Sequence, residues 1–326
     1  MQDIRGMVAL IAISVAGASF SPTLYAQAYP TKPIKLIVPI PPGGGSPDMV
    51  ARLFSLKVAP ELGQPIVVEN RTGSNGNIAA QVVAQSPADG YTVLVAPDTL
   101  MTVNPYLYAK SSFDTQKDFA PIATISSNRF ILSVTPSLPI KSFPDFIEVA
   151  KRANPPLAYA SGGNGSQHHL TMEMLKVRTG IDLLHVPYKG GTPAAVATAA
   201  GETAAAFSGT SVIPLLTSGK LRPIAVAGKV RSAFFPDLPA IAEFYPGFDA
   251  TSWQGLFVPT GTPDPVIVRL RNETNKFLAL ADTKDKYKSA GGLEPFVTTP
   301  TEFSELLRSE HARYSKLVRD LGIVAQ

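Results

Sequence analysis

The sequence predicts an α/β protein with mostly parallel sheets, because one unit recurs along the chain: a short apolar strand, a glycine-rich or polar turn, and a helix. The strands are expected at residues 34–38, 65–70, 91–96, 157–160, 183–186, 204–207 and 224–227. Ligands of such sheets bind beyond the carboxyl ends of the strands. The turns are therefore where a binding site is expected.

The turn at residues 39–48 is the clearest candidate. Ser46 is expected to cap the following helix, with Pro47 at the first helical position and Asp48 in the favourable first turn. The free N–H groups of a helix start, together with glycine amides, suit a carboxylate or a phosphate. The spacing matches neither a P-loop nor a dinucleotide-binding loop. Two interpretations remain: an anion site without a phosphate lysine, or a tight turn only.

Residues 1–28 are interpreted as a secretory signal peptide. Arg5 precedes an uncharged, mostly apolar run at 6–20 that is too short for a comfortable membrane span. Small-residue cleavage sites follow at Ala26 and Ala28. An uncleaved membrane anchor is the alternative.

Composition narrows the class of protein. With 326 residues, of which 45% are apolar, the chain can form two lobes with substantial cores. It has no cysteine, so thiol catalysis and cysteine metal sites are excluded. The net charge of +4 comes from scattered lysines and arginines, so the basic stripe of a nucleic-acid-binding protein is missing.

Two groups of turns, separated by apolar strands near 130–134, predict two lobes. The first lobe is expected to comprise residues 29–126 plus 250–326, and the second residues 127–249. Their glycine-rich edges would face one another across a cleft, so that helix N-termini from both lobes converge on one anion. This is the plan of a hinged solute-binding protein.

No enzyme motif supports another class. The serines near glycine do not form the G-x-S-x-G elbow of a nucleophile. His168 and His169 are adjacent, so they cannot form the i, i+4 metal-binding pair of H-E-x-x-H. We expect no catalytic residue, no metal and no cofactor.

Several short motifs occur along the mature chain in the same order as in one known protein family. They are Val38-Pro39 with Pro42-Gly43-Gly44-Gly45, the stretches 63–71 and 89–92, Gly163-Asn164-Gly165-Ser166, the stretches 185–191 and 236–239, and Trp253 with Gly255-Leu256. In these motifs the chain resembles the Bug (TctC-like) periplasmic solute receptors of tripartite tricarboxylate transporters.

The resemblance implies a two-lobed periplasmic binding protein fold, type II-like, that closes on a small di-, tri- or aromatic carboxylate. The partners would be the membrane permease subunits of a tripartite tricarboxylate-type transporter, and the receptor would be a periplasmic monomer. A receptor that signals to a membrane histidine kinase is the alternative, because both uses depend on the same ligand-driven closure.

The resemblance also implies a set of site residues, in which loop amides and ordered waters hold the carboxylate. The first lobe would contribute Pro42, Gly43, Gly44, Gly45, Ser46 and Asp48. The second lobe would contribute Ser161, Gly163, Asn164, Ser166 and Gln167, with Ser208 and Thr210 nearby. Asp48 is expected to fix the loop rather than touch the anion, since like charges repel.

Two positions depart from the family pattern. His168 occupies the place of a serine or threonine, and it could donate to a second carboxylate or be a solvated first-turn residue. Arg129 replaces an uncharged residue, and it could clamp a distal carboxylate or lie on the surface. His169 is expected to be structural.

Overall fold

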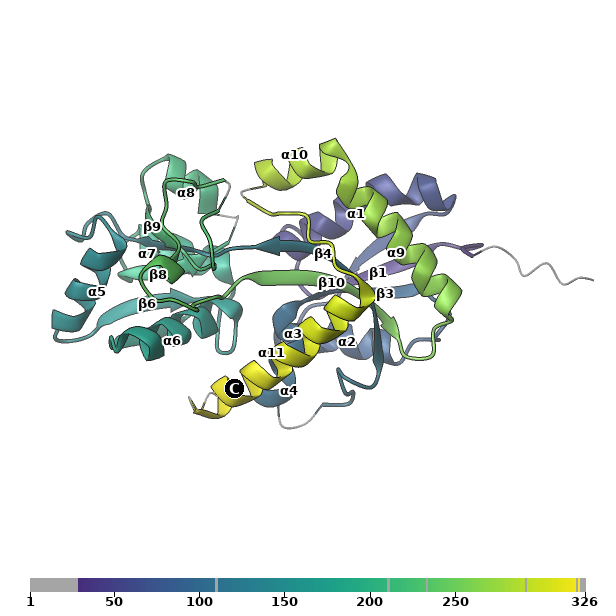
Figure 1. The fold of residues 1–326 in the computed structure, drawn as a ribbon, viewed down its shortest axis with the longest axis horizontal. Coiled ribbons are helices and arrows are strands. Elements are labelled where there is room, and N and C mark those ends of the chain that lie inside the picture. The colour runs from purple at the N-terminus through teal and green to yellow at the C-terminus, as the bar shows by residue number, and fades with distance from the viewer. Residues whose placement is uncertain are drawn as a thin grey trace, which may run out of the picture.

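A computed structural model describes residues 29–108, 111–209, 212–232, 234–290, 292–320 and 322. The predicted signal peptide at 1–28 and Thr210 lie outside the described residues. Figure 1 shows two α/β lobes side by side, with the long strands β4 (Phe119–Asn128) and β10 (Ser252–Pro259) running toward the boundary between them. Within the described ranges, no helix has the length and apolarity needed to cross a membrane.

The first sheet has the strand order β2-β1-β3-β10-β4. Strand β1 (Ile34–Val38) pairs in parallel with β2 (Ile66–Asn70) and β3 (Thr92–Pro97), whereas β10 is antiparallel to β3 and β4. The helices of this lobe are α1 (Ser46–Leu62), α2 (Asn77–Ala84), α3 (Asp98–Thr102), α4 (Asn104–Leu107), α9 (Asp264–Ala279), α10 (Ala281–Ser289) and α11 (Pro300–Asp320), with the 3-10 turn η1 (Ser74–Gly76).

The second sheet has the order β7-β6-β8-β5-β9. Its strands are β5 (Ile131–Val134), β6 (Leu157–Ser161), β7 (Leu183–Pro187), β8 (Ala205–Ser208) and β9 (Arg222–Val226). Strand β6 is parallel to β7 and β8, and β5 is antiparallel to β8 and β9. The helices are α5 (Phe143–Arg152), α6 (Gln167–Thr179), α7 (Gly191–Ala199) and α8 (Ile213–Thr217), with the 3-10 turn η3 (Ile241–Glu243).

The sheets are mixed, rather than mostly parallel as the strand-turn-helix units suggested. The cause is the connection between the lobes. Strand β5 follows β4 directly and enters the second sheet at the lobe boundary, while β10 returns across that boundary into the first sheet. The carboxyl ends of β3 and β8 lie at the lobe boundary, whereas β10 and β5 begin there. Each of these two strands is therefore antiparallel to its neighbour. The carboxyl ends of β1, β3 and β6 still face the boundary, as the sequence predicted.

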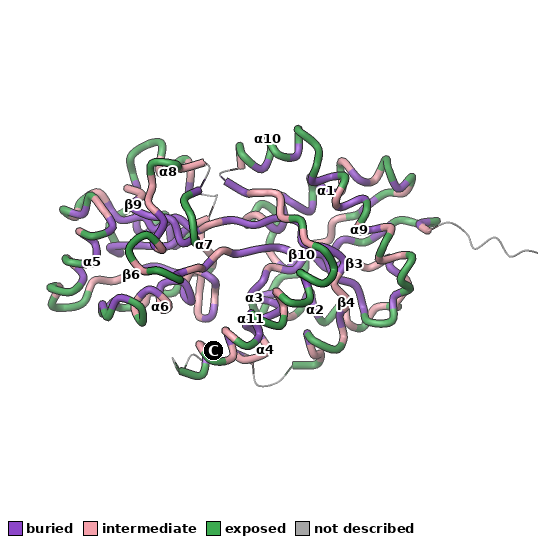
Figure 2. Tube along the Cα trace, in the orientation of Figure 1, coloured by how far each residue is buried: buried purple, intermediate pink, exposed green. Residues whose placement is uncertain are grey.

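Alternating side chains of the first sheet form separate cores on its two faces. Leu36 of β1 packs in one cluster with Phe54 of α1 and Phe277 of α9, while Ile37 packs in the other with residues of α2 and with Phe303 of α11. A further cluster joins Val103, Leu107, Leu170, Tyr314 and Val318, so α11 also touches the second lobe through α6. Figure 2 shows β4 and β10 buried where they run between the lobes.

Candidate ligand-binding cleft

A cavity of about 230 Å³ lies between the two lobes. Its first-lobe wall comes from the turn after β1, from the start of α3 and from β10, and its second-lobe wall from the starts of α6 and α7. Representative lining residues are Gly44, Gly45, Ser46, Asp98, Gln254, Phe130, Ser166, His168 and Gly191. The predicted turns of both lobes thus meet at one cavity.

Gly45, rather than Ser46, occupies the N-cap position of α1, which corrects the sequence prediction by one residue. Gly45 has φ 149°, a conformation that favours glycine, and no side chain caps the helix. The Ser46 hydroxyl instead accepts a hydrogen bond of 2.9 Å from Gln254 Nε2 of β10. The first-turn N–H groups of α1 therefore have no side-chain acceptor at the N-cap.

Asp48 fixes the turn from beneath, as expected. Its carboxylate is 2% exposed and accepts hydrogen bonds from the Gly43 amide at 2.8 Å, Arg52 Nε at 2.9 Å and Asn70 Nδ2 at 2.8 Å. Burial opposes ionisation of Asp48, but the hydrogen bonds from Arg52, Gly43 and Asn70 outweigh it and lower the pKa of the carboxyl. Asp48 does not line the cavity.

The second lobe contributes the start of α6. Ser166 is its N-cap, and its hydroxyl accepts a hydrogen bond of 3.3 Å from the amide of His169. Ser166, Gln167 and His168 all line the cavity. Ser161 lies deeper, where its hydroxyl is 2.6 Å from His185 Nε2 and unexposed to solvent.

A third helix start, which the sequence analysis did not assign to the site, lies beside these two. Gly190 caps α7 with φ 117° and no side-chain acceptor, and Gly190, Gly191 and Thr192 line the cavity. The signal was present, because the run from Gly190 to Pro193 repeats the glycine-then-proline pattern of the turn after β1.

His168 packs within the second lobe, between Phe130 and the start of α7, rather than extending into solvent. Its ring centre lies 4.8 Å from that of Phe130, and a Cβ added to Gly191 would stand only 2.5 Å from its Nε2. Burial lowers the pKa of His168 to about 4, so the ring is neutral at pH 7. His169 is structural, since its ring stacks on His185 at 4.0 Å and its Nδ1 accepts from the Gly165 amide.

Arg129 does not line the cavity. Its guanidinium pairs with Glu294, next to the point where Glu294 bridges to Ser127 of β4. The side chain is largely covered and neutralised, so neither a distal clamp nor a simple surface residue describes it. The predicted clamp at this position therefore has no support in the geometry.

Other expected contacts are also displaced from the cavity surface. Pro42, Gly43, Gly163 and Asn164 belong to the two turns but do not line the cavity, and Ser208 is buried one residue before the lining residue Gly209. The residues that sequence reasoning missed include Asp98, Thr99, Asn128 and Gln254. Asp98 and Thr99 begin α3, Asn128 ends β4 and Gln254 lies in β10, and their approach to the turns depends on the order of the strands in the sheet.

Comparison with known proteins identifies the family. The family model described as "Tripartite tricarboxylate transporter family receptor" (TctC) matches residues 50–323. The chain belongs to this family.

Solved structures agree. The Rpa4515 protein of R. palustris with adipate is 34% identical, covers 91% of this chain and 99% of its own, and superposes with a TM-score of 0.84. The periplasmic binding protein BugD is 29% identical in sequence, and the match covers 91% of this chain and 100% of BugD, with a TM-score of 0.80. MatC of Rhodopseudomonas palustris with bound malate is 29% identical in sequence, and the match covers 89% of this chain and 100% of MatC, with a TM-score of 0.78. This TctC-family protein is therefore a two-lobed binding protein and not an enzyme.

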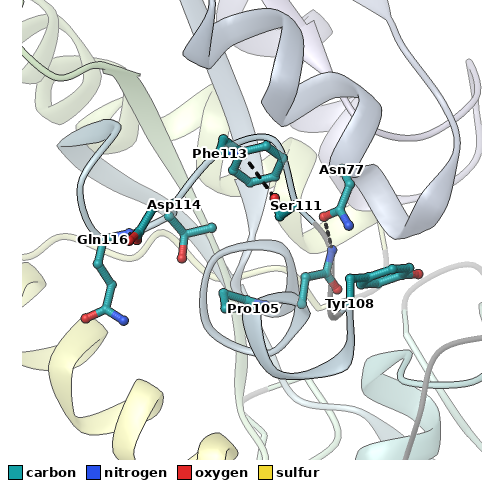
Figure 3. A pocket seen from close by; sticks show the side chains of 9 residues that line it. Asn77, Pro105, Tyr108, Ser111, Phe113, Asp114 and Gln116 are labelled. Carbon is teal, nitrogen blue, oxygen red and sulfur yellow. Dashed lines mark hydrogen bonds between the residues drawn. The ribbon is translucent and has the colours of Figure 1, made fainter.

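A second cavity, of about 280 Å³, lies in the first lobe between the short helix α4 and the loop that follows it. Figure 3 shows its polar lining, including Asn77, which accepts a 2.7 Å hydrogen bond from Asn104, and Asp114 and Gln116 on the facing loop. All of its lining comes from residues 77–116, so only one lobe contributes. The cleft between the lobes is the better candidate in a TctC-family receptor. Among the described residues, no cluster of histidine and acidic side chains could hold a metal ion.

Proposed function

We propose that the protein is a periplasmic receptor that captures a small organic carboxylate between its lobes and delivers it to the membrane subunits of a tripartite tricarboxylate-type transporter. The observation that carries this proposal is that the N-termini of three helices, α1, α6 and α7, converge on one cavity that is lined by residues of both lobes. Each helix start favours an anion by roughly 0.3–1 kcal/mol at exposed sites and by up to about 2 kcal/mol where it is partly buried.

The size of the cleft supports a small ligand. Its volume of about 230 Å³ is below the roughly 300–1,000 Å³ of sites for drug-sized molecules. Adipate in Rpa4515 and malate in MatC are carboxylates of this size class. We assign residues 29–126 plus 250–326 to the first lobe and 127–249 to the second, with residues 1–28 as the export signal.

Ligand binding can be tested on purified residues 29–326 by thermal shift and calorimetry against malate, adipate, citrate and benzoate. A ligand that binds only the folded protein at 100 times its dissociation constant adds about 2.7 kcal/mol to the free energy of unfolding and raises the melting temperature. The absence of a shift with every acid would contradict the proposal.

A charge placed at a helix start locates the site. Ser166→Asp keeps a good N-cap but points a carboxylate at the anion, whereas Ser166→Asn keeps the cap without the charge. We expect Ser166→Asp to weaken carboxylate binding at least tenfold more than Ser166→Asn. Ser142→Asp, at the capped start of α5, serves as the control away from the cleft. Equal affinity of all three variants would place the site elsewhere.

Delivery is tested in cells. Deleting the gene should abolish uptake of the bound acid while leaving its transcriptional induction intact. Loss of induction with intact uptake would favour the histidine-kinase receptor.

A further inference from the structure

Four polar atoms in residues that line the cleft are buried without a hydrogen-bond partner in the described part of the chain: Asp98 Oδ2, Asn128 Oδ1, Gln167 Oε1 and His168 Nδ1. An anionic ligand that came into contact with these atoms would need each of them to act as a hydrogen-bond donor. The two amides can present N–H groups by a 180° rotation, and neutral His168 can carry its proton on Nδ1. Asp98 alone can donate only if it gains a proton.

The contacts of Asp98 leave one carboxyl oxygen open to a proton, although the backbone amide of Trp253 favours the ionised form. The residue is 0% exposed at the start of α3, and its Oδ1 accepts both the Thr99 amide at 2.7 Å and the Ser252 hydroxyl at 3.2 Å. Its Oδ2 receives no donor. One oxygen thus accepts, and the other is left as the place for a proton that can be donated.

The neighbouring acid Glu310 has better compensation for a negative charge. Its Oε2 accepts the indole N–H of Trp253 at 2.9 Å, and its Oε1 lies 3.6 Å from the guanidinium of Arg313. These contacts favour a negative charge on Glu310, but they do not outweigh its burial and the nearby charge of Asp98.

The surrounding charges favour keeping a proton on the pair. The charge of Arg313 favours ionisation of both acids, the charges of Asp98 and Asp249 oppose that of Glu310, and Tyr314 is a third titratable group beside the pair. Burial raises the pKa of Asp98 to about 7, against the opposing hydrogen bonds and the charge of Arg313. Burial and the charge of Asp98 raise the pKa of Glu310 to about 8. A bound anion beside Asp98 would raise the pKa of Asp98 further.

We propose that Asp98 binds the organic acid as a neutral carboxyl, donating its Oδ2 proton to a ligand carboxylate oxygen, so that above neutral pH each bound anion takes up one proton from solvent. The inference rests on the proposed function. It makes Asp98 a ligand-binding residue that selects acids with an ionised carboxylate at this place and rejects those with an ammonium group there.

Calorimetry with malate and adipate across pH tests the inference. Because the free carboxyl must be protonated first, the dissociation constant should rise about tenfold between pH 6 and 8 and about 100-fold between pH 6 and 9. Titrations at pH 8 in two buffers of different ionisation enthalpy should show close to one proton taken up per ligand. A pH-independent dissociation constant, or no proton uptake, would overturn the inference.

Two variants separate the causes. Asp98→Asn offers a fixed N–H donor, so its affinity, whatever its level, should lose both the pH dependence and the proton uptake. Glu310→Gln leaves Asp98 as the only acid of the pair, so the pH dependence and the proton uptake should persist; their loss would assign the proton to Glu310 and refute the role of Asp98. Tighter binding of aspartate than malate at pH 9, lost in Asp98→Asn, would show an ionised Asp98 pairing with an ammonium group. Failure of the wild-type protein to bind any acid at pH 6 would instead refute the proposed function.

Discussion

Replacing Asp48 by asparagine tests whether the turn after β1 is held rigid from beneath. Asparagine has one acceptor oxygen where the carboxylate has two, so either the Gly43 amide or the Asn70 side chain loses its partner. A hydrogen bond to a charged group contributes about 1.5–3 kcal/mol, and less where water can replace it, as at the exposed Gly43. We expect Asp48→Asn to lower the free energy of unfolding by roughly 1–3 kcal/mol in urea denaturation.

The matched control is Asp264→Asn. Asp264 is also in the first turn of a helix, α9, but it is exposed, so only the helix-dipole contribution of about 0.3–1 kcal/mol is lost. The pKa of Asp48 is lowered in the folded protein, so its stabilisation is present above the unfolded pKa and disappears as pH falls through the folded value. The wild-type advantage over Asp48→Asn should therefore shrink below pH about 4. Equal losses for both variants, or an advantage that does not shrink in acid, would refute the anchoring role.

Three further substitutions test the cleft and its surroundings. Gly191→Ala places a Cβ 2.5 Å from His168 Nε2, so the free energy of unfolding should fall by about 1–3 kcal/mol and the affinity for carboxylates should weaken. Adding His168→Ala removes the clash and should recover most of the stability, and no recovery would contradict the steric explanation. Arg129→Ala breaks the ion pair with Glu294 outside the cavity, so calorimetry should show equal changes in affinity for adipate and for a monocarboxylate. A loss of affinity for adipate alone would support the predicted role of Arg129 as a clamp for a distal carboxylate. Tyr314→Phe removes the hydroxyl that accepts from Gln167 Nε2 at 3.2 Å across the lobes, so chemical denaturation should show a loss of about 0.5–1.5 kcal/mol, and an unchanged midpoint would remove this contact from the interface.

The sequence predicted the strand-turn-helix units well, because the information for them is local, but it did not predict β4 and β10, the strands that connect the lobes. Strand β1 has the expected bounds, 34–38, and the other expected strands differ by one or two residues at their ends. Apolar runs bounded by glycine and proline are enough for this. Ser46 shows the limit: its hydroxyl would cap α1 on local rules, but it is bonded to Gln254, 208 residues away.

The interior of the cleft depends on such distant contacts. Arg129 looked available to a ligand until the fold placed Glu294, 165 residues later, beside its guanidinium. Asp98 was not predicted as a site residue, and only the packing of α11 brings Glu310 near it. Both outcomes depend on contacts between segments that are far apart in the sequence, and local patterns do not determine those contacts.

The helix starts of the cleft differ in a way that bears on ligand binding. At α5, outside the cleft, Ser142 caps the helix from an extended conformation with φ −140°, and its hydroxyl accepts from the Asp145 amide. Gly45 and Gly190 instead have φ 149° and 117°, where a capping serine or aspartate would be strained. No side chain can therefore take the place of a ligand at these two N-caps without cost. The amides of α1 and α7 are therefore available to the proposed anionic ligand. They lie on opposite lobes, so one anion that bound to both would also favour closure of the cleft.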